Sequence, residues 1–544
     1  MYQNTKRQII APIVLALTFI CGFVANMMFQ TGEKSIPIFV QPQVDKLTAV
    51  LNAVQANYVD AITKEELIEM ALPIILEQLD PHSVYFPATD YDEISANLEG
   101  NFEGIGVQFV VQNDTIYILR VIPEGPSEEA GLLAGDRIIK INDSIVAGKG
   151  IINDGVIDLL KGEAGSKVVV EVQRRGTEGL TAYEIERAVI PIFSIAISYE
   201  VTDEIGYIKI ERFARNTYEE FQKAVEDLHN KDIHKLIIDL RSNGGGFLEI
   251  ASGIADDFLE NEKLIVYTEG NARPRENYYA SENGTCEDDE VVVLIDSWSA
   301  SASEILAGAL QDNDRGVVVG QRSFGKGLVQ ETTAFRDGSA FRLTIARYYT
   351  PTGRSIQKPY NNTEEYEKEI MTRYEHAEML ETDSIVFNDS LKFTTPKGRI
   401  VYGGGGIMPD VFVPYDTTGW TGYFTELTEK NIIYDFSLIY ADYNREVLSE
   451  MADYKELVAY LEQKNVLAHL IDYAERQGVK KVPKDFIISK KYIVTQLHAY
   501  IARNVFDDAG FYPIIHNIDD TFLKAVDILK TNAIDSILNT PGKL

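Results

Sequence analysis

The sequence predicts a multidomain α/β protein that contains a β-rich module and ends in a helical region. The chain has 544 residues, which is too long for one hydrophobic core and favours about two to four domains. Residues 200–350 alternate between strand-like and helix-like segments, as in a sheet covered by helices. Residues 95–190 instead hold short β-rich runs separated by Gly, Pro and Asn. From about Gly419 onward, the apolar residues follow a helical period.

The first 30 residues predict a membrane anchor. Lys6 and Arg7 precede an apolar run from Ile9 to Phe29, about 20 residues long, which is enough to cross a bilayer. The basic flank is expected to stay in the cytoplasm, so the rest of the chain would lie outside it, in the periplasm or cell envelope. A cleaved signal peptide is the alternative. Because no small-x-small cleavage site follows the run, a retained anchor is favoured.

The segment after the anchor, residues 40–94, is predicted to be helical. Its apolar spacing fits two helices separated near residues 60–63. The β-rich module takes up residues 95–190. Its predicted elements are strands at Ile105–Val111, Thr115–Val121, Asp136–Ile141 and Lys167–Gln173 and a helix at Asp154–Leu160.

Residues 195–415 are predicted to form an α/β core, and residues 416–544 a helical domain. Residues 360–396 are charged and irregular, and are interpreted as an insertion. The glycine run 403–406 fits either a tight chain crossing or simple flexibility. The predicted core strands are 206–211, 235–240, 264–268, 291–295, 316–320, 327–334 and 340–349, and the predicted core helices are 217–229, 247–259 and 303–311.

Charge excludes one class of partner. The formal net charge is −32, so the chain has no basic stripe with which to neutralise phosphates, and nucleic acid is not an expected partner. Only two cysteines are present, Cys21 in the apolar run and Cys286 in a polar stretch. They cannot form a disulfide framework, and they do not identify the redox compartment.

The segment Asp296–Leu306 suits a nucleophile. It follows a predicted strand and opens a helix, so a serine in the turn would lie at the positive end of the helix dipole, beside free backbone N–H groups. Such groups can hold the oxyanion of an acyl-transfer intermediate. The structural alternative is a helix N-cap, a position in which serines are common.

A serine nucleophile needs a base, and none of the seven histidines lies in a recognisable triad context. Ser-Lys pairs are the known alternative, and they need a lysine whose pKa is lowered by burial or by nearby positive charge. Lys326 lies between two glycines that permit close packing in a cleft. A solvated lysine in a surface turn is the competing interpretation.

A third segment, Asp239–Gly246, carries three consecutive glycines after a buried-type strand. They leave backbone N–H groups accessible at the carboxyl edge of the sheet, where sites gather in α/β folds. The alternatives are a tight strand–helix turn and a phosphate loop, but the phosphate-loop pattern is absent.

Together these segments resemble the carboxyl-terminal processing peptidases, also called tail-specific proteases. The family's Ser-Ala-Ser-Ala-Ser-Glu motif matches Ser299–Glu304, and its lysine, 25 positions after the middle serine, matches Lys326. Its Asp-Leu-Arg-x-Asn-x-Gly-Gly motif matches Asp239–Gly246, although Gly244 stands where the family usually has proline. The resemblance runs from about residue 40 to 413 and includes Leu79-Asp-Pro-His-Ser. It leaves out residues 360–396 and the C-terminal helices.

The resemblance implies a ClpP/crotonase-like α/β protease core with an inserted PDZ domain at residues 95–190. It also implies a catalytic set in which Ser301 is the nucleophile, Lys326 the general base and Gln330 the residue that orients the lysine. The oxyanion hole would be formed by the N–H of Ala302 and that of Gly245 or Gly246, of which Gly245 is preferred. The PDZ loop that binds a peptide carboxylate would comprise Gly104, Ile105, Gly106 and Val107.

The function implied by the resemblance is a serine endopeptidase that recognises protein C-termini and cuts nearby. It needs no metal and no organic cofactor, and its expected partners are proteins or peptides with free C-termini. The membrane is contacted through the N-terminal helix, and a homo-oligomer is compatible with the sequence. Two alternatives stand beside it: a catalytically idle PDZ scaffold for envelope proteins, and a Ser-Lys acyl hydrolase that acts on a small molecule.

Overall fold

The computed structural model describes residues 45–112, 114–381 and 388–540. Internal contacts divide the chain into two units, Met1–Leu72 and Pro73–Leu544. The predicted anchor lies outside the described residues. Within the described ranges, no helix has both the length and the apolar character needed to cross a membrane.

The described part of the first unit, from residue 45 onward, holds helix α2 and the start of helix α3, as the sequence predicts. Helix α2 (Lys46–Asn57) begins after Asp45, whose carboxylate accepts a hydrogen bond from Thr48 N at 2.9 Å. This is the N-cap interaction that satisfies an otherwise unpaired helix N–H. Helix α3 (Lys64–Glu77) starts here and ends in the second unit.

The second unit is built on a six-stranded sheet in the order β10-β11-β12-β15-β16-β21. Strand β10 runs antiparallel to β11, and the other neighbouring strands are parallel. The predicted core strands of this sheet are confirmed, whereas β10 was not predicted. The bounds are β10 Ile195–Thr202, β11 Ile205–Ile210, β12 Lys235–Asp239, β15 Glu290–Ile295, β16 Val317–Gly320 and β21 Val411–Phe412.

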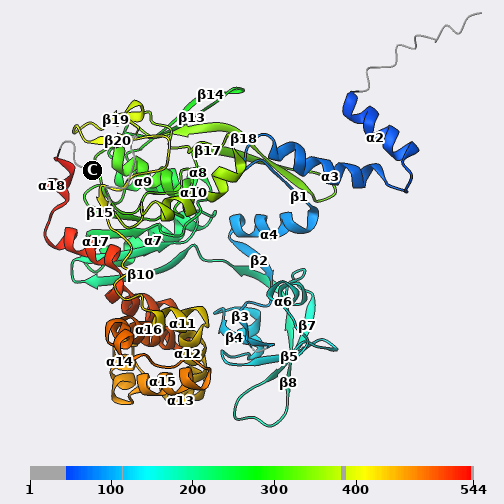
Figure 1. The fold of residues 1–544 in the computed structure, drawn as a ribbon, viewed down its shortest axis with the longest axis vertical. Coiled ribbons are helices and arrows are strands. Elements are labelled where there is room, and N and C mark those ends of the chain that lie inside the picture. The colour runs from blue at the N-terminus through cyan, green and yellow to red at the C-terminus, as the bar shows by residue number, and fades with distance from the viewer. Residues whose placement is uncertain (1–44, 113, 382–387, 541–544) are drawn as a thin grey trace, which may run out of the picture. The chain divides into compact units, whose positions relative to one another are not determined.

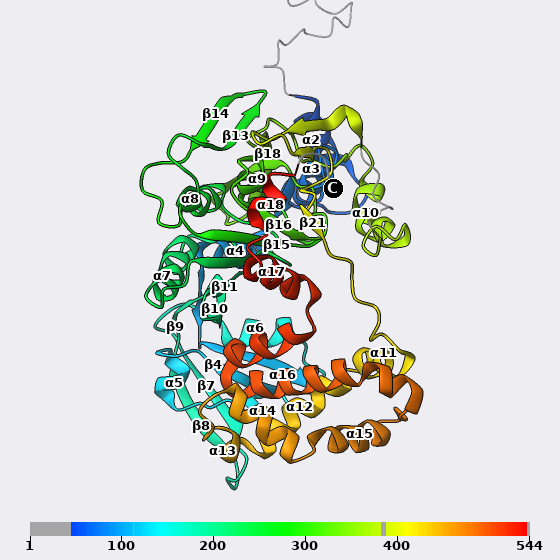
Figure 2. The ribbon, with the colours of Figure 1, turned by 90° about the vertical axis from the view of Figure 1, so that its left-hand side faces the viewer.

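Both faces of this sheet are covered by helices (Figure 1). Successive strand residues point to opposite faces, so Val293 packs in one core cluster and its neighbour Val292 in the other, and neither is exposed. Each such burial contributes roughly 1.5–3 kcal/mol. One face is covered by α7 (Thr217–His229), α8 (Leu248–Phe258) and α9 (Ala302–Asp312), and the other by α17 (Asp520–Lys530) and α18 (Ile534–Leu538) (Figure 2).

A second, antiparallel sheet lies beside the first. Its strands follow the order β1-β18-β13-β14, and β17 pairs with β18. Strand β18 therefore joins the strand that follows Lys326 to the short strand near residue 84. The bounds are β1 Val84–Phe86, β13 Leu264–Gly270, β14 Arg273–Tyr279, β17 Leu328–Ala334 and β18 Ala340–Tyr349.

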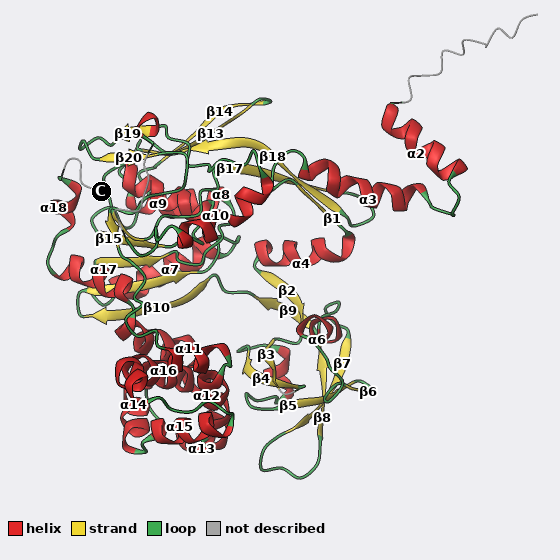
Figure 3. Ribbon diagram, viewed as in Figure 1, coloured by secondary structure: helices red, strands yellow, loops and turns green. Residues whose placement is uncertain are grey.

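The β-rich module is a group of strands with α6 beside them (Figure 3). It has a core of its own, in which Ile116, Ile138 and Val170 are fully buried. The predicted strands and the predicted helix are present, but the strands after residue 180 and a short helix near residue 128 were not predicted. The elements are β2 Asn101–Gly104, β3 Val107–Gln112, β4 Thr115–Val121, α5 Pro126–Ala130, β5 Arg137–Ile141, β6 Ser144–Ile145, α6 Asn153–Leu160, β7 Lys167–Gln173, β8 Thr181–Glu186 and β9 Ala188–Pro191.

The C-terminal region is helical, as predicted. Its helices from residue 422 to 515 share a separate core that includes Leu457, Leu470 and Leu497, whereas α17 and α18 pack on the protease sheet. The helices of the separate core are α11 Gly422–Glu429, α12 Ile432–Tyr443, α13 Arg445–Leu448, α14 Tyr454–Gln463, α15 Val466–Arg476 and α16 Pro483–Ile515.

The interpretation of residues 360–396 as irregular was wrong. Helix α10 (Thr363–Glu375) occupies much of this segment, and β19 (Lys392–Thr394) pairs with β20 (Ile400–Tyr402). Asn362 caps α10, and the charges of the helix pair at four-residue spacing, as in Arg373–Glu369 at 2.5 Å. The low apolar content hid the helical period. A further helix, α4 (Ala88–Glu99), was also not predicted.

Candidate functional site

The predicted nucleophile occupies a strained turn. Strand β15 ends at Ile295 and α9 begins at Ala302, with Ser301 as its N-cap. Ser301 has φ 56° and ψ −113°, which is a costly backbone conformation for a residue other than glycine. Such strain clusters at functional sites, where the surrounding structure holds it in place.

The glycine loop, which is the segment Asp239–Gly246, meets this turn at the carboxyl edge of the sheet, where β12 and β15 both end. Because these two strands are parallel neighbours, the loops that follow them lie together. Ser299 Oγ donates to Leu240 O at 2.8 Å, and Asn243 O accepts from Ala300 N at 3.0 Å and from Ser303 Oγ at 2.9 Å. Three hydrogen bonds therefore fix the nucleophile turn to the glycine loop.

Gly245 touches the turn directly. A Cβ on Gly245 would lie 2.8 Å from Ser301 Cβ and 2.9 Å from Ala302 N, so only glycine fits there. Its own N–H donates to Asn243 Oδ1 at 2.8 Å. Gly246 lies against Phe213, whose carbonyl oxygen a Cβ would approach to 2.1 Å. The structure thus brings the predicted oxyanion residues together around the start of α9.

Glu304 joins the turn at Ser301, called here the nucleophile turn, to the segment 323–327 around Lys326, called here the lysine loop. Its fully buried carboxylate accepts hydrogen bonds from Ser301 N at 2.9 Å, Gly325 N at 2.7 Å and Lys326 N at 2.9 Å, and also from Ser323 Oγ. Hydrogen bonds to a charged group contribute about 1.5–3 kcal/mol each. Burial raises the pKa of Glu304 to about 7, and the donors from Ser323, Lys326 and Gly325 oppose that rise.

Lys326 has the environment that a general base requires. Burial and, after it, the nearby Arg342 cation lower the pKa of its amine to about 8. The Nζ atom donates to Gln330 Oε1 at 2.9 Å. The structure therefore pairs Lys326 with Gln330, as the family resemblance implies.

Gln330 is itself held by the segment before β1. Its Nε2 donates to His82 O at 2.8 Å. The Asp80 carboxylate fixes that segment by accepting from His82 N at 2.8 Å and from Ser83 Oγ at 2.7 Å. Thr344 Oγ1 on β18 donates to the same carboxylate at 3.1 Å. The Leu79-Asp-Pro-His-Ser motif thus supports the lysine through the glutamine.

Two more groups pack the lysine loop. The Tyr348 hydroxyl lies 2.5 Å from Lys326 O and 3.1 Å from Ser301 O, so it links the two catalytic segments. Arg373 on α10 donates to Ser323 O at 2.8 Å. The glycine run 403–406 passes close to the lysine loop, because a Cβ on Gly406 would lie 2.6 Å from Ser323 O. The run is therefore a tight chain crossing.

The predicted carboxylate-binding loop lies between β2 and β3 of the β-rich module. Gly106 has φ 73°, which favours glycine. The carbonyl of Ile105 accepts from Ser127 N at 3.2 Å and that of Gly106 from Ile122 N at 3.0 Å, so the loop is anchored to its neighbours. Ile105 is buried in the core of the module, Gly104 ends β2, and Val107 begins β3.

Family comparisons agree with this division of the chain. Residues 204–364 match Peptidase family S41, and residues 104–182 match the PDZ domain. Residues 423–507, in the helical region, match a family of unknown function.

Curated relatives decide the family. A carboxy-terminal-processing protease of Bartonella bacilliformis is 35% identical over 320 residues, which cover 58% of this chain and 73% of that protein. The chain belongs to the carboxy-terminal processing proteases. CtpB of Bacillus subtilis, another member, is 35% identical over 317 residues, covering 58% of this chain and 65% of CtpB. Among solved structures, the photosystem II D1 C-terminal processing protease is 28% identical, covers 56% of this chain and 88% of that chain, and has a TM-score of 0.31.

Family membership confirms the predicted architecture of an S41 peptidase core with a PDZ domain, to which the structure adds the helical C-terminal region. It also places the chain among serine-type peptidases, so the idle scaffold is not favoured. The catalytic assignments of Ser301, Lys326 and Gln330 remain predictions, which the hydrogen bonds described above support.

Sequence reasoning missed three residues that connect the parts of this site by hydrogen bonds. The sequence indicates Glu304 only as the end of a motif, whereas its four donors come from the Ser301 turn and the loop at Lys326. Tyr348 and Asp80 had no assigned role. For Glu304 a signal existed, because a carboxylate three residues after an N-cap serine is typical of a capping box. For Tyr348 there was none, since a tyrosine in a β-strand is ordinary.

Proposed function

We propose that this protein is a Ser-Lys endopeptidase that cuts near the C-termini of protein substrates, outside the cytoplasm. The observation that carries the proposal is the buried Glu304 carboxylate, which binds Ser301 N and Lys326 N at 2.9 Å each. This bridge fixes the nucleophile turn to the loop of a lysine whose pKa is lowered to about 8. A merely structural serine turn and a solvated surface lysine would have no such connection.

The chemistry follows from the roles of the groups. Neutral Lys326 takes the proton of Ser301 Oγ as that oxygen attacks the peptide carbonyl carbon. The oxyanion is stabilised by the N–H of Ala302 and by that of Gly246, or by that of Gly245 once it leaves Asn243 Oδ1. When the intermediate collapses, the Lys326 ammonium gives its proton to the leaving amine, and an acyl-enzyme remains. Water then attacks the ester, Lys326 accepts the water proton, and Ser301 is released as the proton returns to its oxygen.

The hydrogen bonds around Glu304 suit this mechanism. Four donors converge on the two oxygens of Glu304, and hydrogen bonds to the charged form favour the ionised carboxylate. The carboxylate can then accept all four hydrogen bonds while the lysine acts as a base. Gln330 orients the amine toward Ser301 by accepting from Nζ.

Substrate selection belongs to the PDZ domain in this proposal. Backbone N–H groups of the loop at Gly104–Val107 bind the terminal carboxylate, and the peptide adds as a strand. The apolar run from Ile9 to Phe29 anchors the protein in the membrane, with the peptidase on the outer side.

Cleavage of a protein substrate by the full-length chain in detergent tests this proposal. Two versions of one substrate are compared, with a free and with an amidated C-terminus, and mass spectrometry identifies the products. The proposal expects cleavage of the free form, much slower cleavage of the amidated form, and no cleavage by Ser301→Ala. Full proteolysis by Ser301→Ala would refute the assignment of Ser301 as the nucleophile. Equal cleavage of the two substrates would refute C-terminal recognition and favour the general acyl hydrolase.

The location is tested separately in cells that express the chain. A protease added outside the cytoplasmic membrane should digest the region after residue 45. Protection of this region until the membrane is broken would overturn the extracytoplasmic placement.

A further inference from the structure

A second cluster of polar side chains lies at the opposite, amino edge of the same sheet. His229 ends α7, His234 directly precedes β12, and Asp289 directly precedes β15. Because β12 and β15 are parallel neighbours, their first residues meet, as Lys235 pairs with Glu290. At about 3.3 Å per residue, a five-residue strand separates the two edges by roughly 15 Å. The cluster is therefore remote from Ser301.

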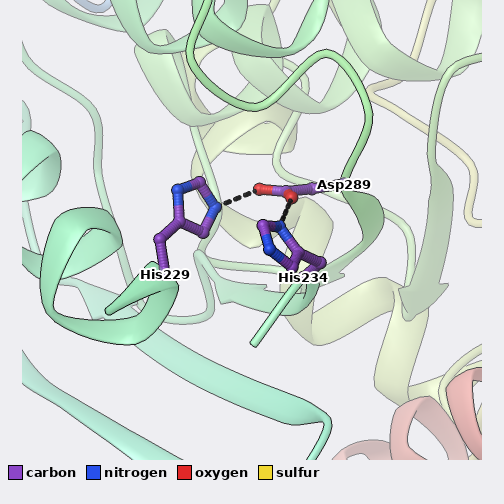
Figure 4. A group of neighbouring side chains, drawn as sticks. All are labelled: His229, His234 and Asp289. Atoms are coloured by element: carbon purple, nitrogen blue, oxygen red, sulfur yellow. Dashed lines mark hydrogen bonds and ion pairs between the residues drawn. The ribbon is translucent and has the colours of Figure 1, made fainter. Parts of the chain in front are cut away.

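The three side chains converge on one point. Figure 4 shows both imidazole rings facing the Asp289 carboxylate, one at each oxygen. His229 Nε2 lies 2.7 Å from Asp289 Oδ2, and His234 Nδ1 lies 2.7 Å from Asp289 Oδ1. The two rings stack with their centroids 4.7 Å apart. One nitrogen or oxygen atom from each residue lies within 4.8 Å of those from the other two.

We propose that His229, His234 and Asp289 bind a divalent transition cation of the Zn²⁺ class. Two imidazoles and one carboxylate are a ligand set that zinc takes, with an open position left for water. At metal–ligand distances of about 2.0–2.2 Å, neighbouring ligand atoms in a tetrahedral site lie roughly 3.3 Å apart. The two N···O distances of 2.7 Å are shorter than this, so both rings would have to move outward for an ion to enter between them and the carboxylate.

Burial and access also suit an ion. The Asp289 side chain is 2% exposed, whereas those of His229 and His234 are 24% and 55% exposed. The carboxylate is thus fixed in the protein, and the two rings border on solvent, from which a cation can enter. Arg315 Nη2 donates to the Asp289 carbonyl at 2.6 Å and holds the main chain that carries this ligand.

A further carboxylate lies where an outer partner of a metal ligand is expected. Histidines that bind a metal through one ring nitrogen usually donate the other N–H to a carboxylate, which fixes the ring and its tautomer. If His234 binds through Nδ1, its Nε2–H points to the outer side, where Asp232 Oδ1 lies 4.0 Å away. At this distance the two groups are an ion pair when His234 is protonated, and no hydrogen bond joins them.

The bound cation would stabilise the fold without entering the peptidase chemistry. It would join the turn between α7 and β12 to the loop before β15, two segments that are 55 residues apart at His234 and Asp289. A ligand that binds only the folded state raises the unfolding temperature, and the rise grows with ligand concentration. Imidazole ligands favour Zn²⁺, Co²⁺ or Ni²⁺ over Mg²⁺, which prefers oxygen.

Titration of the full-length, chelator-treated protein with Co²⁺ tests the site, with visible absorption as the signal. The expected result is one saturable Co²⁺ site, displaced by Zn²⁺, with a metal-dependent rise in Tm that Mg²⁺ does not reproduce. Absence of saturable binding below about millimolar Co²⁺, the weak end of specific affinity, would overturn the proposal and leave a purely hydrogen-bonded His-Asp-His group.

Variants assign the signal to these residues. His234→Gln and Asp289→Asn should each lower Co²⁺ affinity by about tenfold or more. Mutating a residue that only hydrogen-bonds to a metal ligand already lowers metal affinity by about that much. The exposed His469 on α15 is the matched control, and His469→Gln should bind like the parent. If Asp289→Asn does not fold, the Co²⁺ affinity of His234→Gln still tests the site, because His234 is largely exposed. Unchanged affinity in His234→Gln would reject the site.

Discussion

The two edges of the protease sheet each hold a buried carboxylate, but they satisfy it in different ways. At the carboxyl edge, Glu304 accepts from three backbone N–H groups and one hydroxyl, all of which are fixed by the chain. At the amino edge, Asp289 faces two imidazole rings that border on solvent. Backbone donors cannot leave, so they set a rigid geometry for the turn at Ser301 and the loop at Lys326. Side-chain donors can shift, so an ion can enter between the two rings and the carboxylate.

The largest expected effect comes from removing the proposed general base, Lys326, at the carboxyl edge. Lys326→Ala should lower kcat/KM by about 10²–10⁴-fold, because general base catalysis contributes that much. The rate of cleavage of the free C-terminus substrate measures it. Lys455→Ala, an exposed lysine on α14, is the control and should cleave like the parent. Parent-like activity in Lys326→Ala would remove the dyad from the mechanism.

A second prediction concerns the bridging carboxylate. Glu304→Gln places an amide NH₂ against N–H donors, so some donors lose their acceptor at about 1–3 kcal/mol each. We expect a lower Tm and a loss of activity of about 10–100-fold, because the nucleophile turn and the lysine loop move relative to each other. Thermal unfolding and kcat/KM are measured together. Zn²⁺ should not restore Glu304→Gln, and the exposed Glu429→Gln should match the parent; rescue by Zn²⁺ would contradict the separation of the two edges.

Loss of the lysine's partner should act on turnover. Gln330→Ala removes the acceptor of Lys326 Nζ and the link to His82 O. We expect kcat to fall by about 10–100-fold with KM nearly unchanged, since the amine is mispositioned while substrate binding is intact. Steady-state kinetics separate the two constants. A change in KM alone would assign Gln330 to substrate binding.

The smallest effect is a shift in pH dependence. Only neutral Lys326 is a base, so activity should rise as pH increases through about 8 and fall about tenfold per pH unit below it. The Arg342 cation disfavours the ammonium form and lowers the pKa of Lys326, so Arg342→Gln should move the midpoint to higher pH. The pH profile of kcat/KM measures the shift. A midpoint that moves to lower pH would contradict the electrostatic origin.

Sequence reasoning succeeded where local pattern and structure share a cause. Strands such as Val291–Ile295 are continuous apolar runs because both faces of the sheet are covered, and α7 was predicted with its true ends. It failed for α10, whose stability comes from ion pairs and from Arg373 binding the lysine loop. It also failed for β14 (Arg273–Tyr279), a largely exposed strand without an apolar face.

The candidate site divides in the same way. The motif spacing indicated Ser301, Lys326 and Gln330, and the structure pairs the last two. The spacing could not reveal that Glu304 binds the N–H of Lys326, 22 residues further along the chain, since hydrogen bonds between loops leave no periodic trace. His229, His234 and Asp289 were equally hidden. They come together only because β12 and β15 begin side by side.

The last helices have a consequence for the timing of biosynthesis. One face of the protease sheet is closed by α17 and α18, through residues such as Phe522 and Leu529. A ribosome that has made every strand and both catalytic loops has not yet made this cover. The nascent sheet therefore exposes Tyr207, Val292 and Val319 until residues 520–538 arrive. The sheet that carries the Ser301 turn is therefore covered on both faces only after residues 520–538 have been made.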